Sequence, residues 1–397
     1  MALLTRPRRG LALALLAMLL VPVVAIPLRP FKAMSPVENR LLARPPPRPQ
    51  RLADWARLPR RIDAYLADHF AFRDGMIAAN NRLFGRAARA AVSGQADLAA
   101  AIAGHSEAAD AGATGELAAA VEGKAGRMFL TEGLLESTGR ETDRRRAADY
   151  AQFVCQAVRA LRARGIRPIF AIAPSPAAIY PEYAPDWALP PLSPTEYDLI
   201  LRGAAACGAP GIDLRPALRA AKAGTILYRF TDSHWREVGA LAGFNALVAA
   251  AGHPEWVLDP KGAAWTPVTR TDGDLPRLAG LPARAEPDYD TRYVVPPADA
   301  LRGPIKVLPT KEDTPFALAT PRKGASLLII GDSYTEHYFP GFFLNAGLAR
   351  VGWVHEEDCG FDWGAIGAFS PDYVLIMPVE RLALCRPRGA RPKGVPR

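Results

Sequence analysis

The chain of 397 residues is 49% hydrophobic and 22% charged, which allows two medium domains or one large domain with appendages. This composition excludes collagen-like, coiled-coil and wholly disordered proteins. The formal charge of +9 comes from the first 61 residues, because 37 of the 49 Lys/Arg and 38 of the 40 Asp/Glu lie in the remainder. A protein that binds duplex nucleic acid carries its basic residues on the folded domain, so no nucleic-acid partner is expected.

The N-terminal region predicts a membrane anchor. Arg6, Arg8 and Arg9 precede an uncharged stretch, residues 11–28, which is about long enough to cross a bilayer core. Basic residues before such a stretch stay in the cytoplasm, so residues 1–10 are expected to form a cytoplasmic tail and the remainder to be exported. A cleaved signal peptide is the alternative. Either interpretation predicts a protein of the bacterial periplasm, anchored in the inner membrane or released from it.

The rest of the chain alternates between helix-like and strand-like segments. Residues 29–61 are rich in Pro and Arg and predict an extended linker, and residues 62–123 predict a helical region with an Ala-rich insertion. Helices are expected at 144–164, 194–207, 237–251 and 339–350, and strands at 127–130, 168–173, 211–214, 326–330 and 373–377. Short apolar strands separated by helices indicate a parallel sheet covered on both faces, a three-layer α/β fold. This domain is expected to span 124–388, with a strand-rich and loop-rich insertion at 257–323 and a tail at 389–397.

The cysteines permit disulfide bonds. The four are Cys155, Cys207, Cys359 and Cys385, and an even number in an exported protein is compatible with full pairing. Cys359 and Cys385 flank the last predicted strand and are the pair that we expect to be bonded. The sequence has no Cys-x-x-Cys pair or Cys/His cluster, so neither a thiolate metal site nor another cofactor is expected.

Two segments carry side chains suited to nucleophilic catalysis. Asp232 and His234 lie within 230–235, and Ser333 closely follows the predicted strand 326–330. Ligands of doubly wound sheets bind beyond the carboxyl ends of the strands, where a helix N-terminus also offers N–H groups to a developing oxyanion. A serine hydroxyl needs a neighbouring base. We therefore expect His234 to take the proton of Ser333 and Asp232 to orient His234.

Each motif also has a simpler interpretation. Gly-Asp-Ser is common in turns, and Asp-Ser-His can cap a helix while its histidine faces solvent. His337 lies one helical turn after Ser333 and is the main competitor for the role of base. Trp235 is interpreted as a packing residue, with a sugar-stacking surface as the alternative.

The order of these motifs resembles that of the SGNH-hydrolase-like alginate O-acetyltransferases of the AlgX/AlgJ type, in which the Asp-His pair precedes the serine. Further segments similar to signatures of that family are Glu38–Arg40, Tyr65–Asp74, Gly123–Leu130, Ile179–Tyr183 and Asp272–Leu275. Carried over by position, the resemblance implies that Ser333 is the nucleophile, His234 the base and Asp232 the acid that orients it.

Two positions depart from the pattern of that family. Residues 176–178, Pro-Ala-Ala, replace a basic residue that the family pattern places shortly before Ile179. Asp332 stands where the alginate enzymes usually have a small hydroxyl residue. Beyond the amide of Ser333, we predict that the loop 359–364 forms one wall of the oxyanion site.

The resemblance implies an enzyme that moves acetyl groups onto hydroxyls of an exopolysaccharide through an acyl-serine intermediate. It also implies a partner, a membrane O-acyltransferase that supplies the acetyl groups. A periplasmic carbohydrate acetylesterase with the same triad is one alternative, and a non-catalytic polysaccharide-binding or assembly subunit is another. The neutral body of the chain gives no reason to choose an anionic polymer over a neutral one.

Overall fold

The structure of the protein is a computed structural model. It describes residues 119–259, 265–291, 299–305, 315–356, 359–361 and 363–385, with 34–35, 40–41, 45–46, 49, 52–70 and 76 in the N-terminal part. The anchor predicted at 11–28 and the tail predicted at 389–397 lie outside the described residues, as does most of the Ala-rich insertion. Within the described part of the chain, no helix is both long and apolar enough to cross a membrane.

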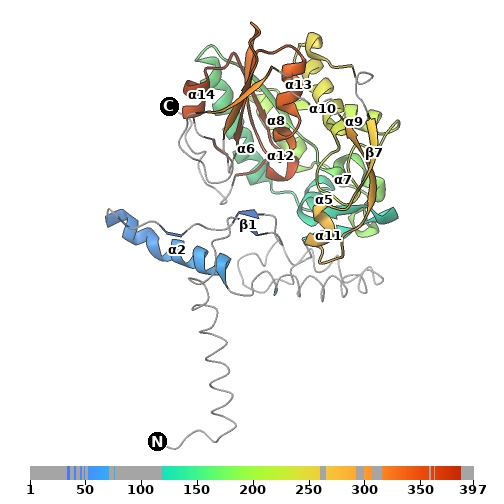
Figure 1. Ribbon diagram of the computed structural model, residues 1–397. Coiled ribbons are helices and arrows are strands. Elements are labelled where there is room, and N and C mark those ends of the chain that lie inside the picture. The colour runs from blue at the N-terminus through green and yellow to red at the C-terminus, as the bar shows by residue number, and fades with distance from the viewer. Residues whose placement is uncertain are drawn as a thin grey trace, which may run out of the picture.

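A sheet of seven strands forms the centre of the domain, in the order β6-β5-β13-β11-β12-β10-β9 (Figure 1). These strands span Arg167–Ile172 (β5), Ile212–Asp213 (β6), Leu301–Pro304 (β9), Phe316–Ala319 (β10), Ser326–Gly331 (β11), Arg350–His355 (β12) and Tyr373–Met377 (β13). The five strands from β6 to β12 are parallel, whereas β10 is antiparallel to both β12 and β9.

The sheet is therefore mixed, and the prediction of a parallel sheet was wrong for one edge. The two antiparallel strands, β9 and β10, come from the region 257–323 that was interpreted as an insertion. In β10, buried residues alternate with half-buried ones, and in β9 most residues are exposed. Such edge strands lack the continuous apolar run that marks a central parallel strand, so they resemble a loop-rich segment in the sequence.

The helix expected at 339–350 is shorter than predicted. Helix α13 spans Phe339–Asn345, and Gly347 then adopts a positive φ of 98°. A glycine in this conformation commonly ends a helix, because it has no Cβ to oppose the left-handed backbone. The chain can then turn back into the sheet, and Arg350 begins β12.

Helices cover both faces of the sheet, as expected for three α/β layers. Figure 1 shows α6 and α14 on one side of the sheet and α10 and α13 on the other. Leu328 and Ile330 of β11 pack with the α6, α8 and α14 layer, whereas Leu327 and Ile329 pack with the α9, α10 and α13 layer. The covering helices are α6 (Arg144–Arg162), α8 (Glu196–Ala206), α9 (Arg215–Ala221), α10 (Glu237–Ala250) and α14 (Gly364–Phe369).

Side-chain caps define the starts of two of these helices. The carboxylate of Asp143 accepts hydrogen bonds from the N–H groups of Arg145 and Arg146 at the start of α6. Thr195 and Asp198 form a reciprocal capping box at the start of α8. These caps satisfy N–H groups that have no partner within the helix, which explains why both helices begin close to the predicted positions.

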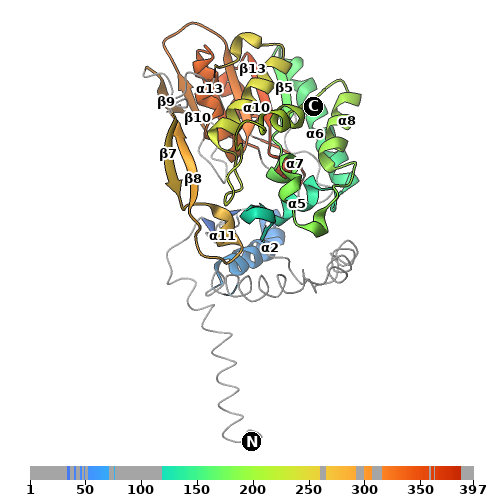
Figure 2. The ribbon, with the colours of Figure 1, turned by 90° about the vertical axis from the view of Figure 1, so that its right-hand side faces the viewer.

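Two small antiparallel sheets lie beside the central sheet. The strand predicted at 127–130 is β4 (Met128–Leu130), which pairs with β3 (Ala120–Glu122) rather than with the central sheet. Strands β7 (Trp265–Arg270) and β8 (Glu286–Thr291) form a two-stranded ribbon, and Figure 2 shows it at one side of the domain with α11 at its lower end. Helix α11 (Asp274–Leu278) packs against β3 and β4, so the ribbon and the hairpin are in contact through it.

The remaining helices are α2 (Leu52–His69), α5 (Thr131–Ser137), α7 (Pro176–Ile179) and α12 (Ser333–Glu336), and β1 (Met34–Ser35) pairs with β2 (Arg40–Leu41).

All four cysteines are paired. Cys359 is bonded to Cys385, as predicted from their positions around the last strand. The second bond, Cys155–Cys207, was not predicted and joins α6 to the residue that follows α8. Both bonds connect segments of one helical layer of the domain.

Candidate active site

His234 lies between Asp232 and Ser333. Its Nε2 atom is 2.9 Å from Ser333 Oγ, and its Nδ1 atom is 2.8 Å from Asp232 Oδ1. Asp232 Oδ1 also accepts a hydrogen bond of 2.9 Å from the backbone N–H of His234, which fixes the carboxylate against the imidazole. The structure thus brings together the three side chains selected from the sequence, although His234 and Ser333 are 99 residues apart.

The turn that presents Ser333 is fixed by the residue before it. Asp332 is the N-cap of α12, and its Oδ1 atom accepts a hydrogen bond of 2.9 Å from the N–H of Tyr334. Its Oδ2 atom accepts one of 2.6 Å from the N–H of Val379, just beyond β13. One carboxylate therefore ties the end of β11 to the end of β13. This two-sided bridge gives a structural reason for the departure from the family pattern, because a serine or threonine hydroxyl is too small to make both contacts.

Tyr334 and Trp235 join the two segments that carry the triad. The buried hydroxyl of Tyr334 donates a hydrogen bond to the carbonyl of Ser233, and burial raises the pKa of Tyr334 above its ordinary value. The Nε1–H of Trp235 donates to the carbonyl of Tyr334 over 3.1 Å. The Trp235 ring also stacks on Phe339 with 5.8 Å between centroids. Trp235 is therefore a packing residue, as its position in the sequence suggested.

His337 does not contact Ser333. It lies exposed at the end of α12, with its ring 6.3 Å from that of Tyr338, whereas Ser333 Oγ faces His234. Of the two histidines considered as the base, His234 is the one in hydrogen-bonding position.

This geometry can be compared with known proteins. A family model described as "SGNH hydrolase-like domain, acetyltransferase AlgX" matches residues 120–367. The chain belongs to this family. The resemblance found in the sequence is thereby confirmed over more than half of the chain. A search of curated proteins finds no match.

The chain is also similar to solved structures. The chain is 19% identical to the O-acetyltransferase domain of Pseudomonas putida AlgJ, with 66% of this chain and 91% of that domain covered and a TM-score of 0.47. It is 14% identical to Pseudomonas aeruginosa AlgX, with 66% and 61% covered and a TM-score of 0.36. A Bacillus cereus PatB1 structure with a sulfonyl adduct is 12% identical, with 64% and 94% covered and a TM-score of 0.45.

In this member of the AlgX-type family, Asp232 is mostly buried and His234 is partly exposed. The side chain of Asp232 is 11% exposed and that of His234 is 31% exposed. Burial opposes ionisation of Asp232, but the hydrogen bonds and charge of His234, together with the charge of Arg229, outweigh it and lower the pKa of Asp232. Asp232 is therefore an anion at neutral pH, which is the state that holds Nδ1–H of His234 and leaves Nε2 free to accept a proton.

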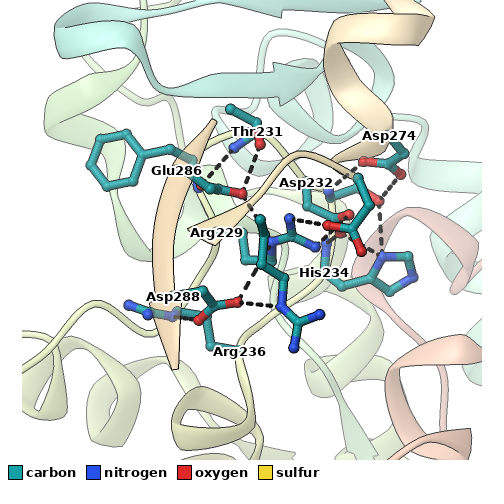
Figure 3. Close-up of polar contacts among 12 residues, drawn as sticks. Arg229, Thr231, Asp232, His234, Arg236, Asp274, Glu286 and Asp288 are labelled. Carbon is teal, nitrogen blue, oxygen red and sulfur yellow. Dashed lines mark hydrogen bonds and ion pairs between the residues drawn. The ribbon is translucent and has the colours of Figure 1, made fainter. Parts of the chain in front are cut away.

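A network of charged residues holds the triad segment, residues 229–236, which carries Asp232 and His234. This network was not predicted from the sequence. Figure 3 shows Arg229 close to Asp232 and Glu286, with Arg236 close to Asp288. Both acidic residues lie on β8, in the region interpreted as an insertion. The only signal in the sequence was the arginine three residues before Asp232, and nothing in the spacing pointed to its partners.

Asp274 holds the residue between the two triad members of this segment. It lies in one of the segments that resemble a family signature, but no role was predicted for it. Its Oδ1 atom accepts from the N–H of Ser233 over 2.8 Å, and its Oδ2 atom accepts from Ser233 Oγ over 2.6 Å. Asp274, Asp232 and His234 place one ligand atom each within 4.8 Å of one another, a spacing that a metal ion could use. Their atoms already bond to protein groups, so the cluster fits a hydrogen-bond network better than a metal site.

A small pocket lies beside the triad segment. Its lining is mostly apolar and comes from β4, α5, the turn after β5 with the start of α7, the segment that carries Asp232 and His234, and the segment after β13: Phe129, Leu130, Gly133, Leu134, Ser175, Pro176, Ala177, Ser233 and Arg381. The Oγ atom of Ser175 is buried and has no hydrogen-bond partner. Pro176 and Ala177 form part of this wall, so the missing basic residue of the family pattern leaves an apolar surface here. The loop 359–364, expected to form another wall, includes Asp362, which lies outside the described residues, and its role stays a prediction.

The buried side chain of Glu380 is hydrogen-bonded to Ser175, a residue that lines this pocket. Glu380 Oε2 accepts hydrogen bonds from the N–H of Ser175 over 2.8 Å and from Ser137 Oγ over 2.9 Å. Burial raises the pKa of Glu380 to about 7, even though both hydrogen bonds favour the anion. The protonation of this residue therefore changes near neutral pH.

Proposed function

We propose that this protein is an O-acetyltransferase that moves acetyl groups onto hydroxyls of an exopolysaccharide through an acyl-serine at Ser333. Membership of the acetyltransferase family supports the general reaction. The contact of 2.9 Å between His234 Nε2 and Ser333 Oγ, with Asp232 on the other ring nitrogen, is the observation that carries the proposal.

In the first step, His234 Nε2 accepts the proton of Ser333 while Ser333 Oγ attacks the acetyl carbonyl carbon. The bond between the acetyl carbon and Oγ forms, and the bond to the donor's leaving group breaks. His234 then gives its proton to that leaving group. Asp232 stabilises the imidazolium that exists between these two transfers.

In the second step, a polysaccharide hydroxyl attacks the acyl-serine. Its proton passes to His234 Nε2 as the new ester bond forms, and the bond to Ser333 Oγ breaks. The proton then returns to Ser333, which restores the free enzyme. The partial exposure of His234 and Ser333 supports this step, since the acceptor is a polymer that must approach from solvent.

A carbohydrate acetylesterase uses the same triad, with water in place of the polysaccharide hydroxyl. Purified protein incubated with an activated acetyl ester, with and without an oligosaccharide acceptor, separates the two. A transferase yields acetylated oligosaccharide and releases less acetate when the acceptor is present. Release of acetate at the same rate in both incubations, with no acetylated oligosaccharide, would favour the esterase.

We also propose that the protein acts in the periplasm, held at the inner membrane by residues 11–28 beside a membrane O-acyltransferase. The pairing of all four cysteines supports export, because disulfide bonds persist in oxidising compartments. An alkaline phosphatase reporter fused to the C-terminus of the full chain tests this location. Activity of the reporter in intact cells is expected, and an inactive reporter would contradict export.

A further inference from the structure

Strand β8 presents two buried acidic side chains to the triad segment. Glu286 and Asp288 are two residues apart in the strand and therefore point to the same face. Glu286 Oε1 accepts a hydrogen bond of 2.9 Å from Arg229 Nε, and Asp288 Oδ1 accepts one of 2.6 Å from Arg236 Nε. The triad segment is thus attached to the β7–β8 ribbon at both of its ends (Figure 3).

Glu286 also holds the backbone that leads to the triad acid. Its Oε2 atom accepts hydrogen bonds from the N–H groups of Phe230 and Thr231, over 2.7 and 3.3 Å. Its Oε1 atom accepts a further bond of 2.7 Å from Thr231 Oγ1. Glu286 therefore fixes both Arg229 and the two residues that precede Asp232.

Arg229 contacts Oδ2 of Asp232, the carboxylate oxygen that His234 does not contact. Its NH1 group is 3.3 Å from Asp232 Oδ2, whereas His234 occupies Asp232 Oδ1. The NH2 group of Arg229 binds the exposed Asp272 over 2.7 Å. With only 12% of its side chain exposed, Arg229 is held on three sides by carboxylates and has one orientation toward the triad.

We infer that Arg229 is a positioning residue of the triad: held by Glu286, it fixes the outer oxygen of Asp232 and keeps a positive charge beside the Asp232–His234 pair. The inference deepens the proposed function and rests on it for the catalytic consequence. A fixed positive charge disfavours a second one on the imidazole, so removing the charge of Arg229 should favour protonation of His234.

Other groups also face His234 and are common to all the variants below. Asp274 reaches it through Ser233, whose Oγ atom is 3.4 Å from Nδ1. The neutral ring of Tyr334 lies 5.4 Å from the imidazole, and Arg381 lies on that ring, with its Cζ atom 5.5 Å from the centroid. Because these groups stay in place, a change in the titration of His234 reports the charge at position 229.

The experiment is an NMR titration of the His234 ring, assigned with a His234→Asn variant, in the full chain. In Arg229→Gln the titration midpoint is expected to rise by about half a pH unit to one unit. In Arg229→Lys it is expected to stay close to that of the wild type, because the charge is kept. Arg284→Gln is the matched control: it removes an arginine that pairs with Glu122 and not with the triad, and is expected to leave the midpoint in place.

Circular dichroism of Arg229→Gln and Arg229→Lys guards against misfolding, and the comparison is made between folded proteins. The rate of acylation of Ser333 by an activated acetyl ester is measured in parallel. As the pH is lowered, this rate should begin to fall at a higher pH in Arg229→Gln than in Arg229→Lys.

Equal midpoints in the wild type and in folded Arg229→Gln would overturn the inference. A wild-type protein that titrates as expected but never acylates Ser333 would instead overturn the proposed function. The two failures are therefore distinguishable.

Discussion

The nucleophile and its base come from two regions that are held in place by different forces. Ser333 follows β11, in which all six residues are buried, and its turn is fixed by hydrogen bonds from backbone N–H groups to Asp332. The segment 229–236, which carries Asp232 and His234, is part of no named helix or strand among the described residues. Ion pairs and hydrogen bonds to β8 hold it instead.

Because of this difference, substitutions in the two regions should affect folding and activity to different degrees. Changes at the turn of Ser333 remove hydrogen bonds that connect two central strands, so they should affect both folding and activity. Changes of charge around the triad segment should affect activity more than folding, because Arg229 contacts Asp232 directly whereas the network holds no strand of the central sheet. The predictions below test this division, beginning with the largest expected effect.

Replacing the nucleophile should abolish turnover. Ser333→Ala is expected to lower the rate of acetyl transfer by at least about 10⁴-fold, because no other group can form the acyl intermediate. The fold should remain, since Ser333 is half-buried and the substitution removes its hydrogen bond with His234 without disturbing a core contact. Acetylated oligosaccharide is quantified by mass spectrometry, with circular dichroism as the control for folding. Unchanged acetylation of polymer in cells carrying this variant would refute the assignment and favour a non-catalytic subunit.

Replacing the triad acid should leave the fold intact but disturb the base. Asp232→Asn is expected to lower kcat/KM by about 10²–10⁴-fold, because the amide cannot stabilise the imidazolium and favours the wrong tautomer. Asp272→Asn is the matched control. It removes an exposed carboxylate that pairs with Arg229 and is expected to change kcat/KM by less than about threefold. Similar losses in the two variants would contradict a specific role for Asp232.

Replacing the residue before the nucleophile should destabilise the protein. Asp332→Ala leaves the buried N–H groups of Tyr334 and Val379 without acceptors, which should cost roughly 2–4 kcal/mol in the free energy of unfolding. Asp332→Asn keeps one acceptor oxygen and should lose about half as much. Urea denaturation of the two variants measures this difference. Wild-type stability in Asp332→Ala would show that the bridge between β11 and β13 is not important for folding.

Replacing Glu380, the buried acid beside the pocket, should change how the free energy of unfolding depends on pH. The folded-state pKa of Glu380, about 7, is higher than the ordinary value of 4.5, so the stability that it contributes is present at low pH and lost as pH rises through about 7. Glu380→Gln removes this titration while keeping a carbonyl acceptor for Ser175 and Ser137. Between pH 5 and pH 8, the variant is expected to gain stability relative to the wild type, by at most about 3 kcal/mol. Parallel stability curves for the two proteins over that range would exclude a raised pKa.

The sequence predicted four of the five parallel strands of the central sheet, β5, β6, β11 and β13, and the convergence of the triad, because both leave local signals. The apolar run at 326–330 corresponds to β11, and the capped apolar repeat at 144–164 corresponds to α6. Strand β12 was not predicted: the helix expected at 339–350 overlaps only its first residue, Arg350, and no element was assigned to residues 351–355.

The electrostatic support of the triad had no such signal. Arg229 and Glu286 are 57 residues apart, and Glu286 lies in a segment whose composition is typical of loops. An ion pair of this kind depends on which strands meet, not on spacing or periodicity along the chain. Only the fold reveals it, whereas a triad can be found from the few residue types that its chemistry requires.

The central claim is that Ser333 forms an acyl intermediate with His234 as its base. The most direct test is mass spectrometry of peptides from the full chain after brief exposure to an activated acetyl ester. We predict one acetyl group on the peptide containing Ser333, absent from Ser333→Ala and strongly reduced in His234→Asn. Acetylation of other residues alone, or equal labelling of Ser333 with and without His234, would contradict the account.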